Sequence, residues 1–210
     1  MNQIRAPTHV VAYVKRLCDD NFGAVLEWDA EPEVQLKFDA LPGEPRNSDV
    51  VFHARDARGP YLVAVEAKAD EIICRDHRAD YGGCARRRLR NPRSNGLLRI
   101  QQLASALFAP RSPGDTPLAE LRYQLLTATA GALCEAERNG NSRVVLLVQE
   151  FINLETRDEN HARNAADFEK FVGRLSGGAV KKDNSRQSAL WTILLARRSP
   201  LQRKCRAFCW

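Results

Sequence analysis

The sequence has no long hydrophobic run. Its first ten residues, MNQIRAPTHV, contain no apolar segment typical of a signal peptide, and no stretch approaches the roughly 18 consecutive apolar residues of a membrane span. These absences predict a cytoplasmic protein. Internal repeats and low-complexity tracts are also missing, and 210 residues that are 44% hydrophobic can bury a full core. A single domain, 1–210, is therefore expected.

The sequence also has no CxxC pair, although it contains six cysteines. A cytosolic chain of this size does not need disulfides, and its thiols are expected to stay reduced as small core residues. Zinc ligands could be drawn from Cys74, His77 and Cys84, or from Cys205 with Cys209. Neither set has the paired short spacings that are typical of structural zinc sites.

Acidic residues are absent from one basic segment, CARRRLRNPRSN, within a chain of net charge +6. Basic runs of this kind bind the phosphates of a polyanion, or they form a solvated loop. The segment predicts a polyanionic partner such as a nucleic acid. The candidate nucleic-acid-binding residues are Arg86, Arg87, Arg88, Arg90 and Arg93.

The spacing of apolar residues predicts an α/β protein with a mixed sheet flanked by helices. Helical spacing is found over 9–19, 95–108, 117–140 and 160–178, and strand-like runs over 33–38, 48–55, 61–68, 143–151 and 189–196. Residues 69–96 show little periodicity and read as an irregular basic insertion, while 151–210 add a helix and a strand to the core. The first three strands of the sheet are expected to be antiparallel, and the last two are expected to be parallel.

The runs SDVVFHAR and YLVAVEAK, joined by DARGP, predict an antiparallel hairpin. If its turn centres near Ala57 and Arg58, residues whose numbers sum to about 115 face each other, so Asp49 lies opposite Glu66. Side chains alternate along a strand, so Lys68 shares the face of Glu66 while Ala67 points away. The hairpin therefore gathers two carboxylates and an ammonium group.

Two buried carboxylates repel each other, and a divalent cation such as Mg²⁺ relieves this repulsion by ligation. A neighbouring lysine can orient a water molecule and stabilise charge on a phosphoryl oxygen, which is the chemistry of phosphodiester hydrolysis. Alternatively, Glu66 and Lys68 form a surface ion pair. The uninterrupted apolar run YLVAV before Glu66 favours the buried arrangement.

With Asp49, Glu66 and Lys68 in this spacing, the chain resembles the PD-(D/E)XK nuclease superfamily, although Ser48 replaces the loosely kept proline of its motif. It is also similar to an uncharacterised bacterial branch in SDVVFHARDARGPYLVAVEAKADE and LRYQLLTATAGALCEAERNGNSRVVLLVQEF. The resemblance implies a restriction-endonuclease-like αβββαβ core and a Mg²⁺-dependent nuclease that also accepts Mn²⁺. The nuclease is expected to act on DNA in preference to RNA, and as an endonuclease rather than an exonuclease. Many nucleases of this fold act as homodimers.

The resemblance further implies roles for individual residues. Asp49 and Glu66 would ligate Mg²⁺ with the Ala67 carbonyl as third ligand, and Lys68 would position the attacking water. Gln124 is the candidate for an additional polar catalytic residue, and its alternative is an amide at the border of a helix stripe. An acidic residue from the N-terminal region is also common in the family. Glu27 and Asp29 are both candidates, and the sequence does not separate them.

Two other functions are compatible with the same sequence. The protein could be a nucleic-acid-binding protein or complex subunit that keeps the fold without catalysis. It could also be a metal-independent interaction domain whose E-x-K tripeptide is an ion pair. His53 alternates onto the face of Asp49, and a structural role is favoured for it over a catalytic one.

Overall fold

The computed structural model describes residues 8–43, 45–68, 72–73, 81–151, 157–177 and 190–196. Of residues 8–10, 21, 81–83 and 190–196 it describes the backbone only. Among the helices in these ranges, none combines the length and the hydropathy that a bilayer-spanning segment requires.

A five-stranded mixed sheet forms the centre of the protein, as the α/β prediction requires. Its spatial order follows the sequence: β1 (Glu27–Leu36), β2 (Arg46–Asp56), β3 (Gly59–Lys68), β4 (Arg143–Glu150) and β5 (Leu190–Ala196). The pairs β1–β2, β2–β3 and β4–β5 are antiparallel, and β3–β4 is parallel.

The prediction that the last two strands are parallel is confirmed for β4, which is parallel to β3, and is wrong for β5, which is antiparallel to β4. Gln149 at the end of β4 pairs with Leu190 at the start of β5, so β5 begins beside the C-terminal end of β4. A helix that crosses the sheet once returns the chain to the opposite edge and gives a parallel strand. Here residues 178–189 follow α5 (Asp158–Ser176) before β5 begins, so the connection is longer than one helix.

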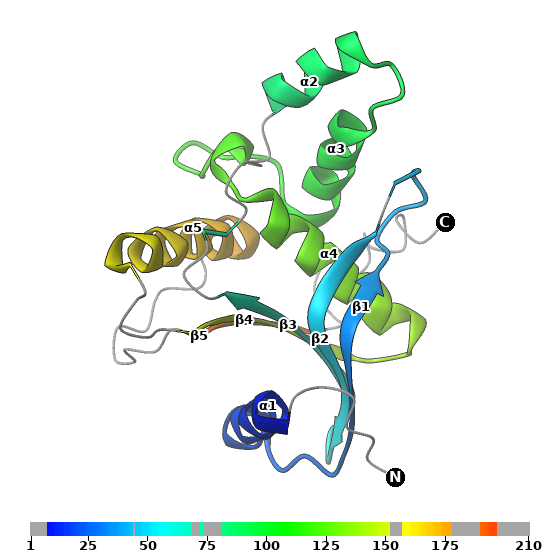
Figure 1. Ribbon diagram of the computed structural model, residues 1–210, viewed down its shortest axis with the longest axis vertical. Helices are drawn as coiled ribbons and strands as arrows, with labels where there is room; N and C mark the ends of the chain where they lie inside the picture. Colours follow the sequence, from blue (N-terminus) through cyan, green and yellow to red (C-terminus); the bar gives the residue numbers. More distant parts are fainter. Residues whose placement is uncertain are drawn as a thin grey trace.

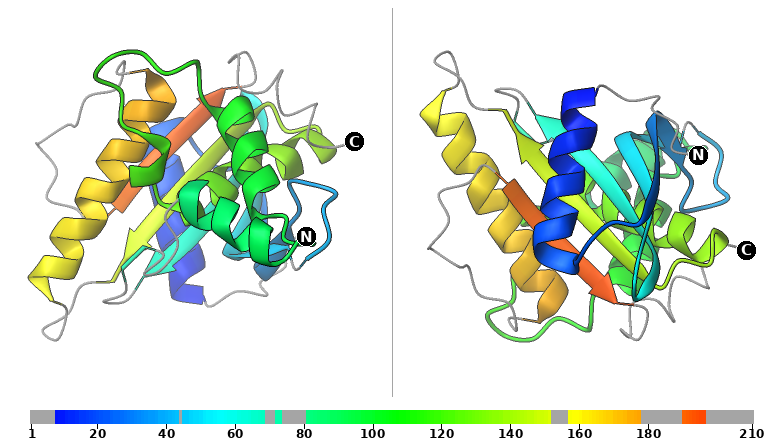
Figure 2. Two further views of the ribbon diagram at one scale, coloured as in Figure 1. Left: turned by 90° about the horizontal axis from the view of Figure 1, so that it is seen from above. Right: turned by 90° about the horizontal axis from the view of Figure 1, so that it is seen from below.

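Helices cover both faces of the sheet (Figure 1). One face is crossed by α1 (Thr8–Phe22), as the right-hand view in Figure 2, seen from below, shows. The other carries α4 (Tyr123–Arg138) and α5, with α3 (Gly96–Leu107) beyond them, and α2 (Tyr81–Arg90) lies at the end of the molecule farthest from α1. Alternation along the buried strands gives two apolar cores. Val63 and Val65 pack on the α1 side, whereas Leu62 and Ala64 pack on the side of α4.

The first strand and the helix expected over 117–140 have different boundaries in the structure. The first strand begins at Glu27 instead of residue 33, because it pairs with β2 along its whole length from Glu27 opposite Arg55. Its Pro32 is tolerated because β1 is an edge strand. The helix expected over 117–140 consists of a 3-10 turn, Leu118–Glu120, and α4, which begins at Tyr123.

The segment 69–96, expected to be irregular, contains the helix α2. Arginine and leucine are good helix formers, so the run of basic residues favours a helix once a neighbouring element supports it. That element is α3, against which α2 packs. A Cβ at Gly96 would lie 3.2 Å from Cys84 Sγ, so glycine permits the close approach of the two helices.

A second glycine brings α4 against β1. A Cβ at Gly131 would lie 2.8 Å from Leu36 Cβ and 3.1 Å from the Leu36 carbonyl oxygen, closer than side-chain contacts allow. The helix-interior glycine is therefore explained by packing, since it costs about 1 kcal/mol in helix propensity. The close contact between Gly131 and Leu36 holds α4 against the sheet and thereby helps to position the first turn of α4.

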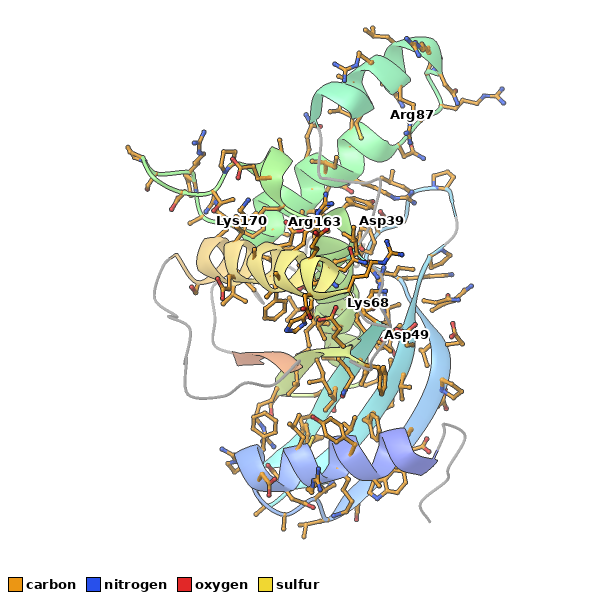
Figure 3. The ribbon with its side chains drawn as sticks, turned by 60° about the vertical axis from the view of Figure 1, so that its left-hand side comes forward. Asp39, Asp49, Lys68, Arg87, Arg163 and Lys170 are labelled. Carbon is orange, nitrogen blue, oxygen red and sulfur yellow. The ribbon has the colours of Figure 1, made fainter. Side chains whose placement is uncertain are left out.

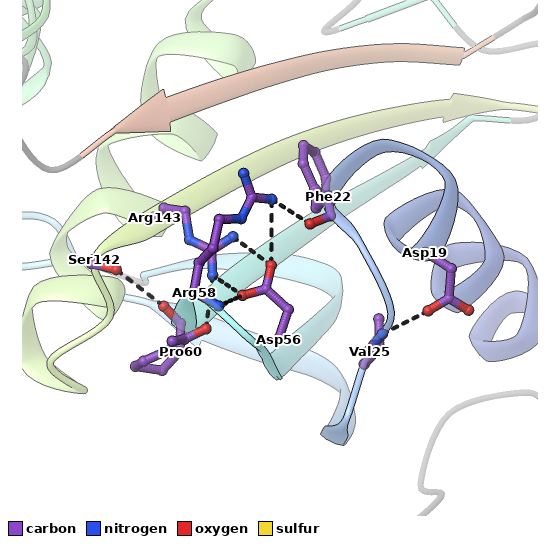
Figure 4. A network of polar contacts seen from close by, with 9 residues as sticks. Asp19, Phe22, Val25, Asp56, Arg58, Pro60, Ser142 and Arg143 are labelled. Carbon is purple, nitrogen blue, oxygen red and sulfur yellow. Dashed lines mark hydrogen bonds and ion pairs between the residues drawn. The ribbon is translucent and has the colours of Figure 1, made fainter.

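A buried ion-pair network fixes the hairpin turn between β2 and β3 (Figure 4). The Arg143 guanidinium donates two hydrogen bonds to Asp56, at 2.7 and 2.6 Å, and a third to the Gly59 carbonyl at 2.7 Å. The Arg58 amide donates to Asp56 at 2.8 Å, and its side chain donates to the carbonyl of Phe22. The network joins the hairpin to α1 and β4.

These hydrogen bonds, those from Arg143 above all, lower the pKa of Asp56 from 3.8 to about 2 although burial opposes the shift. The folded state therefore gains stability from the ionised carboxylate above pH 3.8 and loses it as the pH falls toward 2. We expect Asp56→Asn to lower the free energy of unfolding by about 2 kcal/mol at neutral pH. In urea titrations at a series of pH values, this difference in the free energy of unfolding should shrink below about pH 4, where the Asp56 carboxylate of the unfolded chain becomes protonated.

The matched control is Asp20→Asn, because Asp20 is an exposed carboxylate on α1. We expect it to change stability by less than about 0.5 kcal/mol at any pH. A loss in Asp56→Asn that stayed the same from neutral pH to pH 2 would contradict the role of the charge.

Candidate active site

The hairpin register places Asp49 and Glu66 side by side. Paired residues of β2 and β3 run from Asp56 opposite Gly59 to Val50 opposite Val65, which confirms the predicted register. Asp49 and Glu66 are one step beyond this last pair. The Ala67 amide donates a hydrogen bond of 2.6 Å to Asp49 Oδ2, so the Asp49 side chain reaches across to β3.

Glu66 is a buried carboxylate at the end of the apolar strand β3, with 3% of its surface exposed. Its Oε2 accepts hydrogen bonds from the Arg46 guanidinium and from Gln124 Nε2, the latter at 3.2 Å. Its Oε1 is buried and has no hydrogen-bond partner within the described part of the chain. An unsatisfied carboxylate oxygen in the interior is costly, and a bound cation would remove the cost.

Burial raises the pKa of Glu66, and the nearby charge of Asp49 raises it further, while Arg46 and Lys68 act in the opposite direction. The repulsion between Asp49 and Glu66 that the sequence predicts is therefore present in the folded protein. A carboxylate beside a second carboxylate is an arrangement that a hard divalent cation stabilises.

Lys68 ends β3 on the same face as Glu66, with its side chain half-buried. In Figure 3, Asp49 and Lys68 lie on the side of the sheet that faces α4 and α5. Ala67 points to the opposite face, and its N–H is taken up by Asp49. A metal-ligand role of the Ala67 carbonyl remains a prediction.

Gln124 comes to the site from the first turn of α4. The helix starts late because Arg122 is extended and turns its side chain into the interior, where it donates to Asp167 of α5 at 2.6 Å. Arg122 is 1% exposed. The buried ion pair therefore fixes the start of α4, and with it the position of the Gln124 amide over Glu66.

The two acidic candidates from the N-terminal region lie away from this site. Glu27 is 75% exposed at the far end of β1 and lies 3.4 Å from Arg55. Asp29 pairs with His53, which is four residues, about 13 Å, from Asp49 along β2. The structure therefore brings together Asp49, Glu66, Lys68 and Gln124, and it does not bring Glu27, Asp29 or His53 to them.

A second buried carboxylate adjoins Lys68. In the parallel register of β3 and β4, Lys68 pairs with Glu150, whose side chain is fully buried. Glu150 accepts a hydrogen bond of 2.7 Å from Asn164 Nδ2, and His161 Nδ1 lies against its other oxygen. Asn164 also accepts a hydrogen bond of 2.8 Å from the Ile73 amide.

Sequence reasoning missed Arg46, Glu150, His161 and Asn164. Glu150 had a usable signal, since it ends the apolar run RVVLLVQE as Glu66 ends YLVAVE. The helical spacing over 160–178 predicts the helix but does not show which of its polar residues are buried. In the structure Asn164 and Asp167 are buried, and each has a hydrogen-bonded partner.

The five arginines expected to bind nucleic acid lie on α2 and on the turn that follows it. All of them are exposed. Figure 3 shows Arg87 on α2, beyond the layer of helices that covers Asp49 and Lys68. The basic segment is thus a projecting helix instead of the expected irregular loop.

Only some of the residues predicted to bind Mg²⁺ or zinc lie within the described part of the chain. Within them, no three or more His, Cys, Asp or Glu side chains converge where a metal could bind. Asp49 and Glu66 provide two carboxylates, and Mg²⁺ commonly binds through one or two carboxylates together with waters and substrate phosphates. Cys74, His77, Cys205 and Cys209 lie outside the described residues. Cys84 is half-buried between α2 and α3.

Fold and site together define an α/β protein with a mixed five-stranded sheet and a pair of carboxylates beside a lysine at one edge of it. The chain belongs to the family described as Domain of unknown function (DUF6946), whose family model matches residues 2–196. No curated protein and no solved structure matched the chain when it was compared with them.

Proposed function

We propose that this protein is a Mg²⁺-dependent nuclease that hydrolyses phosphodiester bonds in DNA. The observation that carries the proposal is the buried carboxylate of Glu66, which has one unsatisfied oxygen and lies within electrostatic reach of Asp49. A buried carboxylate oxygen without a hydrogen-bond partner costs stability, and a bound cation would remove this cost.

The element order supports a restriction-endonuclease-like core. Helix α1, the three antiparallel strands β1 to β3, helix α4 and the parallel strand β4 follow the order αβββαβ, with α2 and α3 inserted before α4. The acidic residue near the start of β2 and the E-x-K tripeptide at the end of β3 support the proposal, because the PD-(D/E)XK motif has its charged residues at such strand ends.

The residues of the site divide the chemistry among them. Asp49 and Glu66 would hold Mg²⁺, and the bound metal would supply Lewis-acid chemistry at the phosphate. Lys68 would hold the attacking water and neutralise charge that develops on the phosphoryl oxygens. Gln124 orients Glu66 through the hydrogen bond to its Oε2. Arg46, the second donor to Glu66, adds positive charge where the phosphate would bind.

The test is cleavage of plasmid DNA by the purified protein with Mg²⁺, with Mn²⁺ and with excess EDTA. We expect cleavage with either metal, none in EDTA, and recovery when Mg²⁺ is restored in excess. Lys68→Ala should be inactive, whereas Lys37→Ala, which removes an exposed lysine outside the site, should cleave normally. Cleavage that continued in EDTA, or that Lys68→Ala retained, would refute the proposal.

The contact between Arg46 and Glu66 favours a second candidate function. The guanidinium compensates the charge of Glu66 without a metal, as expected of a nucleic-acid-binding subunit that has the fold but no catalysis. Salt-sensitive DNA binding in EDTA, together with no cleavage under any divalent metal, would support this candidate instead.

A further inference from the structure

Helix α2 carries a basic surface that none of the other helices and strands in the described ranges covers. From Arg86 to Arg90 every side chain is exposed, so the outer sides of the helix are open to solvent over more than one full turn. Arg90 lies four residues after Arg86 and three after Arg87, so it neighbours both of them on the helix surface. Arg88 lies on the side toward the next turn and donates to the Ser94 carbonyl at 2.8 Å.

An apolar side chain lies among these arginines. Leu89 is 86% exposed, which makes it the most exposed of the large apolar side chains that the structure describes. A surface that binds phosphates alone has no use for such a side chain. A helix placed in a nucleic-acid groove does, because it meets base edges, including the methyl group of thymine.

The arm formed by α2 and α3 is anchored beside the candidate active site. Arg99 of α3 donates to Asp39 at 2.7 Å and to the carbonyls of Leu41 and Pro42 at 3.1 and 3.2 Å. Asn95 also donates to the Pro42 carbonyl at 3.2 Å. These contacts hold the loop that leads into β2, where Arg46 and Asp49 begin the site.

We propose that α2 inserts into the major groove of duplex DNA, and that double-stranded DNA is the substrate class of the candidate site. The inference rests on the proposed function, because it assigns the bound duplex to that site. Arg86, Arg87 and Arg90, together with Arg93, neutralise the phosphates that border the groove, while Leu89 meets base edges.

Size and shape select DNA over RNA. An α-helix about 10–12 Å across fits the major groove of B-form DNA, which is about 12 Å wide. With 10 residues, α2 is about 15 Å long and can follow the groove over several base pairs. The major groove of A-form RNA is too deep and narrow for side chains to read, so an RNA duplex would meet phosphate contacts only.

The test is fluorescence anisotropy of one labelled sequence as duplex DNA, duplex RNA and single-stranded DNA, in EDTA so that no cleavage occurs. We expect the full chain to bind duplex DNA at least about tenfold more tightly than the other two. In Arg87→Ala/Arg90→Ala, the slope of log Kd against log salt should fall by about 2, one for each lost phosphate contact, and the preference for DNA should shrink.

The matched control is Arg16→Ala/Arg55→Ala, which removes two exposed arginines, one on α1 and one at the far end of β2. It should leave the slope and the preference unchanged. Equal affinity for RNA or single strands would overturn the proposal, as would tighter binding to anionic phospholipid vesicles or a slope that the α2 variant did not alter. Folding of each variant is checked by its unfolding midpoint.

The outcomes separate this inference from the proposed function. Duplex-specific binding through α2 without cleavage under Mg²⁺ or Mn²⁺ would support the role of α2 and refute the nuclease. Metal-dependent cleavage with unchanged binding by the α2 variant would support the nuclease and refute the role of α2.

Discussion

Replacement of Glu66 by glutamine is expected to lower Mg²⁺-dependent DNA cleavage by at least about 1,000-fold while the fold is retained. Glutamine has the same shape, and its amide oxygen can accept the hydrogen bonds from Arg46 and Gln124. It does not carry the negative charge that a hard cation requires of its ligand. Single-turnover cleavage at saturating Mg²⁺ measures the loss.

The same variant is expected to change how the stability of the protein depends on pH. Because the pKa of Glu66 is raised above its ordinary value of 4.5, the folded chain keeps a proton that the unfolded chain has already released. Stability of the metal-free protein therefore falls as the pH rises from 4.5 through the raised pKa. Relative to the wild type, Glu66→Gln should become more stable over this pH range, as measured by urea denaturation.

Mg²⁺ should raise the melting temperature of the wild type and not that of Glu66→Gln, because only the wild type offers both carboxylates. The matched control is Glu120→Gln, which changes an exposed carboxylate paired with Lys170 outside the site. It should cleave DNA as the wild type does. If Glu66→Gln kept more than a tenth of wild-type activity, Glu66 would stabilise the transition state by less than about 1.4 kcal/mol. Such a result would contradict the role of Glu66 as a metal ligand.

The second large effect is expected at the buried ion pair between Arg122 and Asp167, whose side chains are 1% and 7% exposed. Asp167→Ala removes the carboxylate and leaves the guanidinium charge in the interior, where desolvation is costly. We expect the free energy of unfolding to fall by about 3–5 kcal/mol, or the melting temperature by roughly 10 °C. Chemical denaturation measures the first quantity and calorimetry the second.

A double variant, Arg122→Met/Asp167→Leu, separates the charge from the packing. It replaces both ions by apolar groups of similar volume and should recover most of the stability that Asp167→Ala loses. Its cleavage activity reports whether the late start of α4 places Gln124, because methionine at residue 122 does not form the ion pair that fixes this start. A loss below about 1 kcal/mol in Asp167→Ala would show that the pair contributes no more than a surface contact.

Local patterns in the sequence predict most of the secondary structure. The short connection DARGP between the strand-like runs SDVVFHAR and YLVAVEAK sets the hairpin and its register, because the length of a hairpin loop fixes which residues face each other. That register alone brings Asp49 to Glu66. The carboxylate pair and the shared face of Lys68 are consequences of local chemistry, so they could be predicted.

Long-range contacts decide what the sequence leaves open. Strand β1 extends back to Glu27 because it pairs with β2, and α2 forms where α3 supports it. In the sequence, the buried polar residues of α5 look like residues of an exposed helix face. A polar side chain is buried only where a hydrogen-bonding partner is available, and that partner can lie far away in the sequence. Those partners, Glu150 for Asn164 and Arg122 for Asp167, are 14 and 45 residues away.

The sequence by itself therefore determined the hairpin and the pairing of Asp49 with Glu66, because strand alternation and turn chemistry act over neighbouring residues. Only the tertiary structure decided that Arg46 and Gln124 meet at Glu66, that Glu150 adjoins Lys68, and that the arginines project on a helix. These features depend on which distant elements pack together, and the free energy of that packing is shared among many residues instead of being encoded in one local motif.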